Sequence, residues 1–190
     1  MSSSEVRSIG VTLDGSRVAG VSTDGSRVLV APVDEDGPAV QVVSGARNLL
    51  PPAWEFADRM WLVDRNRGSA RVLTVTGTRV RSVQVPGVSG RDVEQLLVSR
   101  DGSRLVAVVS ARGGDRVVAS RVLHDDAGRV VGATPARRLA YEPDASGQVR
   151  DIAWRTPTAV SVLSDINEDL SQVRTVSVDG APGELTTTGS

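Results

Sequence analysis

The sequence predicts an all-β protein built from repeated four-stranded antiparallel units. Three observations support this fold class. Valine, which is β-branched and favours strands, is the main apolar residue. The apolar and alternating runs are short, and Gly, Asp or Pro interrupts them about every ten residues. Long stretches with the 3.6-residue period of an amphipathic helix are missing.

Three segments repeat one turn phrase, in which an Asp-Gly pair joins two apolar runs. The phrase occurs at residues 11–18, 21–28 and 98–110. Glycine adopts positive φ without penalty and aspartate tolerates it, so each pair is predicted to close a tight hairpin.

The first half of the chain divides into two such units, at approximately 5–48 and 49–88. Asp14-Gly15, Asp24-Gly25 and the loop Asp34-Glu35-Asp36-Gly37 connect the strands of the first unit. Pro51 and Pro52 limit the start of the second, because proline cannot donate to a strand ladder. The predicted strands are 5–12, 17–21, 27–33 and 39–43, then 49–56, 60–64, 70–75 and 79–85.

The second half divides into units at approximately 89–142 and 147–190. Asp101-Gly102 and Gly113-Gly114 make the first two turns of the third unit. The predicted strands are 92–99, 104–110, 115–123 and 129–132, with a last strand near 137–141 on the edge, and then 148–154, 159–164, 172–178 and a short strand near 184–187.

The spacing of the units predicts a β-propeller of four-stranded antiparallel blades. Trp54 and Trp154, each in a first strand, lie 100 residues apart, or two units of about 50. Such blades must stack to bury their apolar faces. About four blades are present, and an arc of a larger propeller is favoured over a four-bladed ring. The alternative fold is an unrelated β-sandwich.

Composition excludes several classes of function. The 190 residues carry a net charge of −1, which does not favour nucleic acid, and all 22 basic residues are arginine. The absence of cysteine excludes disulfides and thiolate chemistry. No signal peptide opens the chain and no apolar run is long enough to span a membrane. The polar ends at 1–5 and 186–190 predict a fragment of a longer protein.

Motifs for catalysis or metal binding are incomplete. His124 is the only histidine and is interpreted as an exposed loop residue, and Gly87-Val88-Ser89-Gly90 misses the nucleophile-elbow pattern. The segment 165–176 resembles a calcium loop but has Leu170 and Val176 where glycine and glutamate are needed. The acidic 34–37 loop is too short to form a cage. No catalytic residue, cofactor or metal ligand is therefore predicted.

Two surface interpretations stay open. A hydrolase or sugar-binding propeller would need acids from several first strands to meet in one pocket, and the candidates are Glu5, Glu55, Asp92, Glu94 and Asp151. Arginines gather near the turns of the second unit, where a mixed, solvated surface is preferred to a basic contact patch. These arginines are Arg59, Arg65, Arg67 and Arg71. The three tryptophans Trp54, Trp61 and Trp154 are predicted to pack between blades.

Several phrases resemble known propellers. Residues 99–106, which contain Asp101-Gly102, resemble the repeat of TolB-like and WD40-like propellers. A more specific resemblance, to the C-terminal propeller region of the LpqB lipoprotein family of actinobacteria, lies in the combination of 11–22, 52–54, 60–64, 97–109 and 152–154. The exclusive use of arginine fits such a genome.

The resemblance implies a function without a chemical reaction. In that family a lipid anchors the protein outside the cytoplasmic membrane, a GerMN-type module precedes the propeller, and the protein acts with the MtrA–MtrB two-component system. The expected function is therefore a non-enzymatic protein-interaction domain of a cell-envelope lipoprotein, whose partner is the extracellular part of a sensor histidine kinase. A structural spacer is the alternative. The chain has no lipobox cysteine and no GerMN module, so the anchor is expected outside this fragment.

Overall fold

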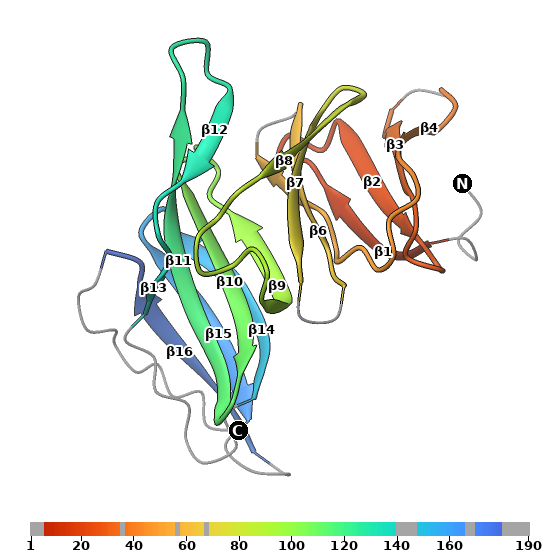
Figure 1. Cartoon of the computed structure of the whole chain (residues 1–190). Helices are drawn as coiled ribbons and strands as arrows, with labels where there is room; N and C mark the ends of the chain where they lie inside the picture. The colour runs from red at the N-terminus through yellow and green to blue at the C-terminus, as the bar shows by residue number, and fades with distance from the viewer. Residues whose placement is uncertain are drawn as a thin grey trace.

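The computed structural model is all-β and contains four antiparallel sheets in sequence order (Figure 1). It describes residues 6–34, 37–55, 58–66, 69–139, 148–165 and 170–179. The sheets stand next to one another as propeller blades, with the first and the fourth at opposite ends of an open arc. No helix that could cross a membrane occurs in the ranges described.

The first two sheets are four-stranded meanders, as the turn phrases predicted. The second differs from prediction at its first strand, which is three residues long because Pro51 and Pro52 precede it; Leu49 forms only an isolated bridge to Asp64. The strands are β1 (Val6–Val11), β2 (Arg17–Ser22), β3 (Val28–Pro32) and β4 (Val40–Val43), then β5 (Ala53–Glu55), β6 (Arg59–Asp64), β7 (Arg71–Thr76) and β8 (Arg79–Val83).

The third sheet has a divided outer strand. The long strand β11 pairs with β12 near its C-terminal end and with β13 at Val118 and Ala119, so β13 continues the line of β12 instead of adding a separate edge. The expected strand at 137–141 is thus shortened to two residues, and Tyr141 lies outside the described ranges. The strands are β9 (Asp92–Val98), β10 (Arg104–Ala111), β11 (Gly114–His124), β12 (Val130–Ala133) and β13 (Arg137–Arg138).

The fourth sheet has three strands in its described part, β14 (Val149–Thr156), β15 (Ala159–Asp165) and β16 (Ser171–Ser177). The short strand expected near 184–187 lies outside that part. The first strands β1, β5, β9 and β14 contact one another in succession, as the innermost strands of neighbouring blades do.

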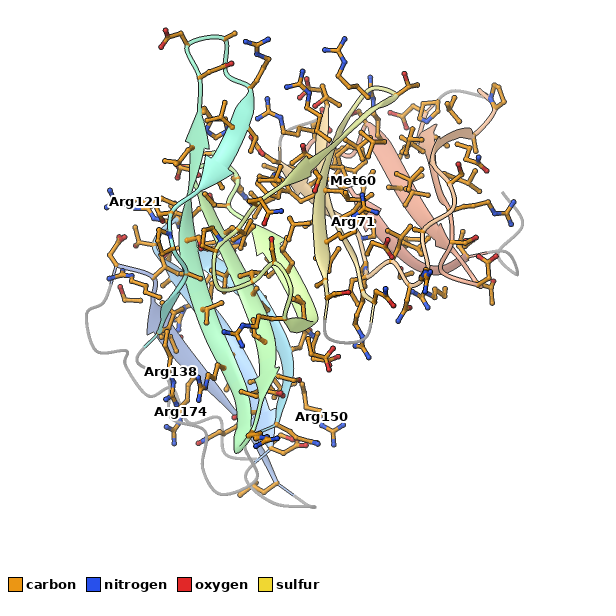
Figure 2. The ribbon with its side chains drawn as sticks, in the orientation of Figure 1. Met60, Arg71, Arg121, Arg138, Arg150 and Arg174 are labelled. Atoms are coloured by element: carbon orange, nitrogen blue, oxygen red, sulfur yellow. The ribbon has the colours of Figure 1, made fainter. Side chains whose placement is uncertain are left out.

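Three apolar cores hold the blades together, one at each junction. Strand β6 serves two of them: Met60 and Leu62 pack toward the first sheet, and Trp61 and Val63 pack toward the third (Figure 2 labels Met60). Strand β10 divides its side chains in the same way between the second and fourth sheets. A strand covered on both faces needs apolar residues at consecutive positions, which explains why 60–63 and 105–109 are unbroken apolar runs.

The tryptophans lie at these junctions, as predicted. Trp61 is fully buried between the second and third sheets. Trp54 packs on the core between the first and second, and its Nε1 donates a hydrogen bond of 3.0 Å to the carbonyl of Gly10 on β1. Trp154 packs on the core between the third and fourth. The tryptophans therefore join blades and do not form an exposed stacking platform.

Candidate functional site

The acids proposed for a hydrolase site do not meet. Glu55 lies at the junction of the second and third sheets, whereas Asp92 and Glu94 flank Arg65 at the N-terminal end of β9. Asp151 accepts a hydrogen bond of 2.8 Å from the backbone N–H of Ile152. Glu5 is outside the described residues. The four described acids therefore do not form a shared catalytic pocket.

Glu55 is the most buried of these carboxylates, with 1% of its surface exposed. Trp61 Nε1 donates to its Oε2 at 2.6 Å, and Arg59 Nη1 donates to its Oε1, also at 2.6 Å. Gly102 of the third sheet lies against the same carboxylate. A buried charge is stable only with such partners, so Glu55 is a polar link between two blades.

His124 lies at the same junction. The sequence placed this residue in an exposed loop, but it ends strand β11 and its side chain is only 27% exposed. Its Nε2 is 3.5 Å from Glu55 Oε1. The expected loop placement was therefore wrong, because β11 extends through His124, whereas the residue as a whole is exposed, as expected.

The calcium-like segments offer no described metal cage. Asp165 receives hydrogen bonds from Arg150 Nε at 2.6 Å and from the Ser171 hydroxyl at 2.9 Å. Residues 166–169 and 35–36 lie outside the described ranges. Within those ranges no three metal-ligating side chains come together.

The Asp-Gly turns share one hydrogen-bonded arrangement. At 99–104 the Ser99 hydroxyl donates to Asp101 Oδ1 at 2.6 Å, and the same aspartate accepts from the backbone and hydroxyl of Ser103 at 3.0 and 2.8 Å. The Ser99 hydroxyl in turn accepts from Arg104 N at 2.9 Å. The hydrogen bond from Ser99, more than any other cause, lowers the pKa of Asp101 to about 2.

An open pocket of about 490 Å³ lies where the first strands of three blades end. Trp54 contributes from β5, Val11 and Leu13 come from the end of β1 and its turn, and Leu97 and Arg100 come from the end of β9 and its turn. Because first strands are innermost, this pocket is at one axial mouth of the arc. The remaining lining residues are Gly10, Pro52, Ala53, Val98 and Asp101.

A second pocket, of about 260 Å³, extends the mouth toward the fourth blade. It shares Arg100 and Asp101 with the first pocket and adds Trp154 and Arg155 from β14. The two pockets therefore adjoin, and we name their combined lining the axial mouth.

Glycine allows the blades to meet closely at this mouth. A Cβ on Gly10 would lie 2.6 Å from the carbonyl oxygen of Pro52, which is closer than real Cβ atoms approach. Gly10 also provides the carbonyl that Trp54 Nε1 contacts. The first and second blades are thus in close contact at the rim, through the backbone at Gly10 and Pro52 and through the Trp54 side chain.

The mouth is bordered by exposed apolar side chains. Ile9 is 60% exposed, Val11 52% and Leu13 62%. Single exposed apolar residues are ordinary, but three at alternate positions along one strand and its turn form a continuous surface. The alternation of the apolar residues 9, 11 and 13 is visible in the sequence, but only the arrangement of the neighbouring blades shows that this face of β1 is left uncovered.

Comparison with known proteins identifies the family. The model of the lipoprotein LpqB beta-propeller domain matches residues 1–189. The lipoprotein LpqB of Streptomyces coelicolor is 29% identical over 140 residues, covering 72% of this chain and 22% of the relative. That of Thermobifida fusca is 26% identical over 225 residues, covering 97% of this chain and 34% of the relative. The chain thus spans about a fifth to a third of the length of these relatives.

Solved structures share the fold at low sequence identity. TolB from Acinetobacter baumannii has a TM-score of 0.65 at 13% identity, with 96% of this chain and 43% of that chain covered. A puromycin-hydrolyzing peptidase of Mycobacterium tuberculosis has a TM-score of 0.57 at 19% identity, covering 93% and 28%. These similarities establish a propeller architecture that occurs in proteins of different function. The family-model match over residues 1–189 places the chain in the family of the lipoprotein LpqB β-propeller domain.

Proposed function

We propose that this domain is a non-enzymatic protein-interaction module of an LpqB-type envelope lipoprotein, and that the axial mouth is its contact surface. The observation that carries the proposal is that the exposed Val11 and Leu13 line the mouth together with Trp54, with the exposed Ile9 two positions before Val11 on β1. Interface centres are enriched in apolar and aromatic residues and depleted of charge. Rigid blades that present such a row lose little conformational entropy on binding.

The proposed partner is the extracellular sensor part of a histidine kinase of the MtrA–MtrB type. The support is family membership together with a surface that suits another protein better than a small molecule, because the pockets are open and their apolar border faces outward. The relatives are named lipoproteins, which supports a place outside the membrane with the lipid anchor on another part of the protein. A net charge of −1 argues against nucleic acid.

The experiment measures binding of the complete lipoprotein ectodomain to the kinase ectodomain by calorimetry. Leu13→Asp places a charge in the mouth, and Val131→Asp is the matched control, because Val131 on β12 is 64% exposed and lies away from the mouth. We expect Leu13→Asp to weaken binding at least about tenfold and Val131→Asp to leave it unchanged. Equal binding by both variants would exclude the axial mouth as the contact surface. No binding between the two folded wild-type proteins would favour the alternative function, a structural spacer.

A further inference from the structure

A second surface feature, which shares no lining residue with the axial mouth, is a groove between the outer strands of the second and third blades. Strands β8 and β12 contact each other there (Figure 1). The groove encloses about 110 Å³ and four arginines line it. We name it the arginine groove; its lining residues are Arg59, Thr74, Thr76, Arg79, Arg81, Arg129 and Val130.

Strand register explains why these residues meet. Arg59 on β6 is paired with Thr76 on β7, which is paired with Arg79 on β8. Thr74 on β7 is likewise paired with Arg81 on β8. Directly paired residues lie on one face of an antiparallel sheet, so three arginines and two threonines share the face of the second blade that looks toward the third.

Two of the guanidinium groups are held in place by other groups. Arg59 donates to Glu55 at 2.6 Å and to the carbonyl of Gly128 at 2.7 Å, which ties the groove to the turn before β12. Arg129 donates to Asp125 through Nε at 2.8 Å, and this contact holds the pKa of Asp125 below its usual value. Both side chains are thus oriented before any ligand arrives.

The other two guanidinium groups have no such partner. Arg79 and Arg81 are exposed, and beyond the backbone pairing of β8 with β7 neither guanidinium group forms a hydrogen bond or ion pair with another described residue. They stand two positions apart on the same face of β8, where like charges repel. Among the described residues, Glu55 and Asp125 are the two carboxylates that bond to arginines of the groove, so the four arginines leave an excess of positive charge there.

We propose that the arginine groove binds a phosphate group. Arginine offers a planar fork of N–H donors that matches phosphate oxygens in pairs, and the hydroxyls of Thr74 and Thr76 add neutral donors. The volume of about 110 Å³ is suited to a single oxyanion group. The site is independent of the contact surface proposed above, because the two pockets have no lining residue in common.

The arginines near the turns of the second unit, for which a mixed, solvated surface was preferred to a basic patch, do not by themselves form the groove. Arg65 pairs with Glu94, Arg71 does not line the groove, and Arg67 lies outside the described residues. Only Arg59 of that group contributes. The informative signal was the alternation of Arg79 and Arg81 in a predicted strand, which places both side chains on one face.

The experiment is a calorimetric titration of the whole chain with inorganic phosphate. Chloride keeps the ionic strength constant and serves as the competing ion. We expect saturable binding with a dissociation constant on the order of 1 mM or below. Arg79→Gln and Arg81→Gln should each weaken it about tenfold, because each removes charge-assisted hydrogen bonds. Arg112→Gln, on the exposed turn between β10 and β11, makes the same charge change elsewhere and should leave binding unchanged.

A second titration identifies the source of the phosphate group. Vesicles of phosphatidylglycerol are compared with vesicles of phosphatidylcholine, using the same three variants. Binding of free phosphate or of the anionic vesicles supports the proposal if Arg79→Gln and Arg81→Gln weaken it and Arg112→Gln does not. Absence of binding to both probes, or binding that the three variants leave equally strong, would overturn it. Circular dichroism of each variant verifies that it is folded.

Discussion

The turns at Asp14-Gly15 and Asp101-Gly102 have nearly the same sequence and the same local structure. In each, the aspartate Oδ1 accepts a hydrogen bond of 3.0 Å from the serine N–H two positions later, and the glycine has positive φ, +73° and +66°. Their surroundings differ. A Cβ on Gly15 would meet nothing within 4 Å, whereas a Cβ on Gly102 would lie 2.2 Å from Glu55 Oε1.

The difference separates two roles of one motif. The turn at 14–15 only connects two strands, since its side faces open space. The turn at 101–102 also presses against the next blade, where Glu55 is fixed by Trp61 and Arg59 and cannot retreat. The local hydrogen bonds of the phrase therefore form at every copy, and the contact between blades forms only where a neighbouring blade meets the turn.

Gly102→Ala is the change with the largest expected effect. The new Cβ strains a backbone with positive φ and collides with the fixed Glu55 carboxylate, so we expect a loss of about 3 kcal/mol in the free energy of unfolding. Gly15→Ala imposes only the strain and should cost about 1 kcal/mol. Urea unfolding of both variants measures the two costs. Equal losses would show that Gly102 makes no contact of consequence between blades.

Glu55→Gln tests the other side of this contact. Glutamine keeps the shape and can still accept from Trp61, but it removes the negative charge that pairs with Arg59. We expect a loss of about 2 kcal/mol, below the full cost of breaking a buried pair because Arg59 retains its bond to Gly128 and is 18% exposed. Thermal unfolding measures it, with Glu94→Gln as the control at a more exposed pair. A larger loss in the control would contradict the assignment.

Removal of the turn hydroxyls should affect the two turns equally. Ser99 and Thr12 are 2% and 4% exposed, and each accepts a hydrogen bond from a backbone N–H at 2.9 and 3.0 Å. We expect Ser99→Ala and Thr12→Ala each to cost about 1 kcal/mol in urea unfolding. A loss confined to Ser99→Ala would mean that the phrase is stabilised by its neighbouring blade and not by its own bonds.

Acid should weaken all copies of the phrase, and because these carboxyls lie at the surface, where solvent screens their interactions, we expect the smallest effect per residue here. Hydrogen bonds from Thr12, Ser22 and Ser99 are the main cause that lowers the pKa of Asp14, Asp24 and Asp101 to about 2 each, against about 3.9 in an unfolded chain. A carboxyl with a lowered pKa stabilises the fold above its unfolded pKa, and that contribution is lost as the pH falls from about 4 to about 2.

Asp101→Asn isolates one copy of this titration. At pH 3 the variant should take up fewer protons on unfolding than the wild type does, and the difference should be less than one proton per molecule. Its urea unfolding midpoint should therefore change less than that of the wild type between pH 4 and pH 2. Urea unfolding at several pH values in this interval measures the difference. The same pH dependence in wild type and variant would show that Asp101 does not contribute.

The fold was largely predictable because its signals are local. Asp-Gly turns, valine-rich runs and the 100-residue interval between Trp54 and Trp154 suffice to predict propeller blades. The two errors have different causes, one local and one that depends on distant segments. Residues 49–52 do not extend β5, because the two prolines lack backbone donors. His124 is drawn toward Glu55, a contact between residues 69 positions apart in the chain.

Glycine and aspartate at 14–15, 24–25 and 101–102 determined the turns by themselves, because a positive φ and a side-chain hydrogen bond to a nearby N–H require only neighbouring residues. Tertiary structure alone decided which turn packs against Glu55, which face of β1 stays open beside Trp54, and which arginines share the groove between β8 and β12. These outcomes depend on how one blade stacks on the next, and no short stretch of sequence contains both partners.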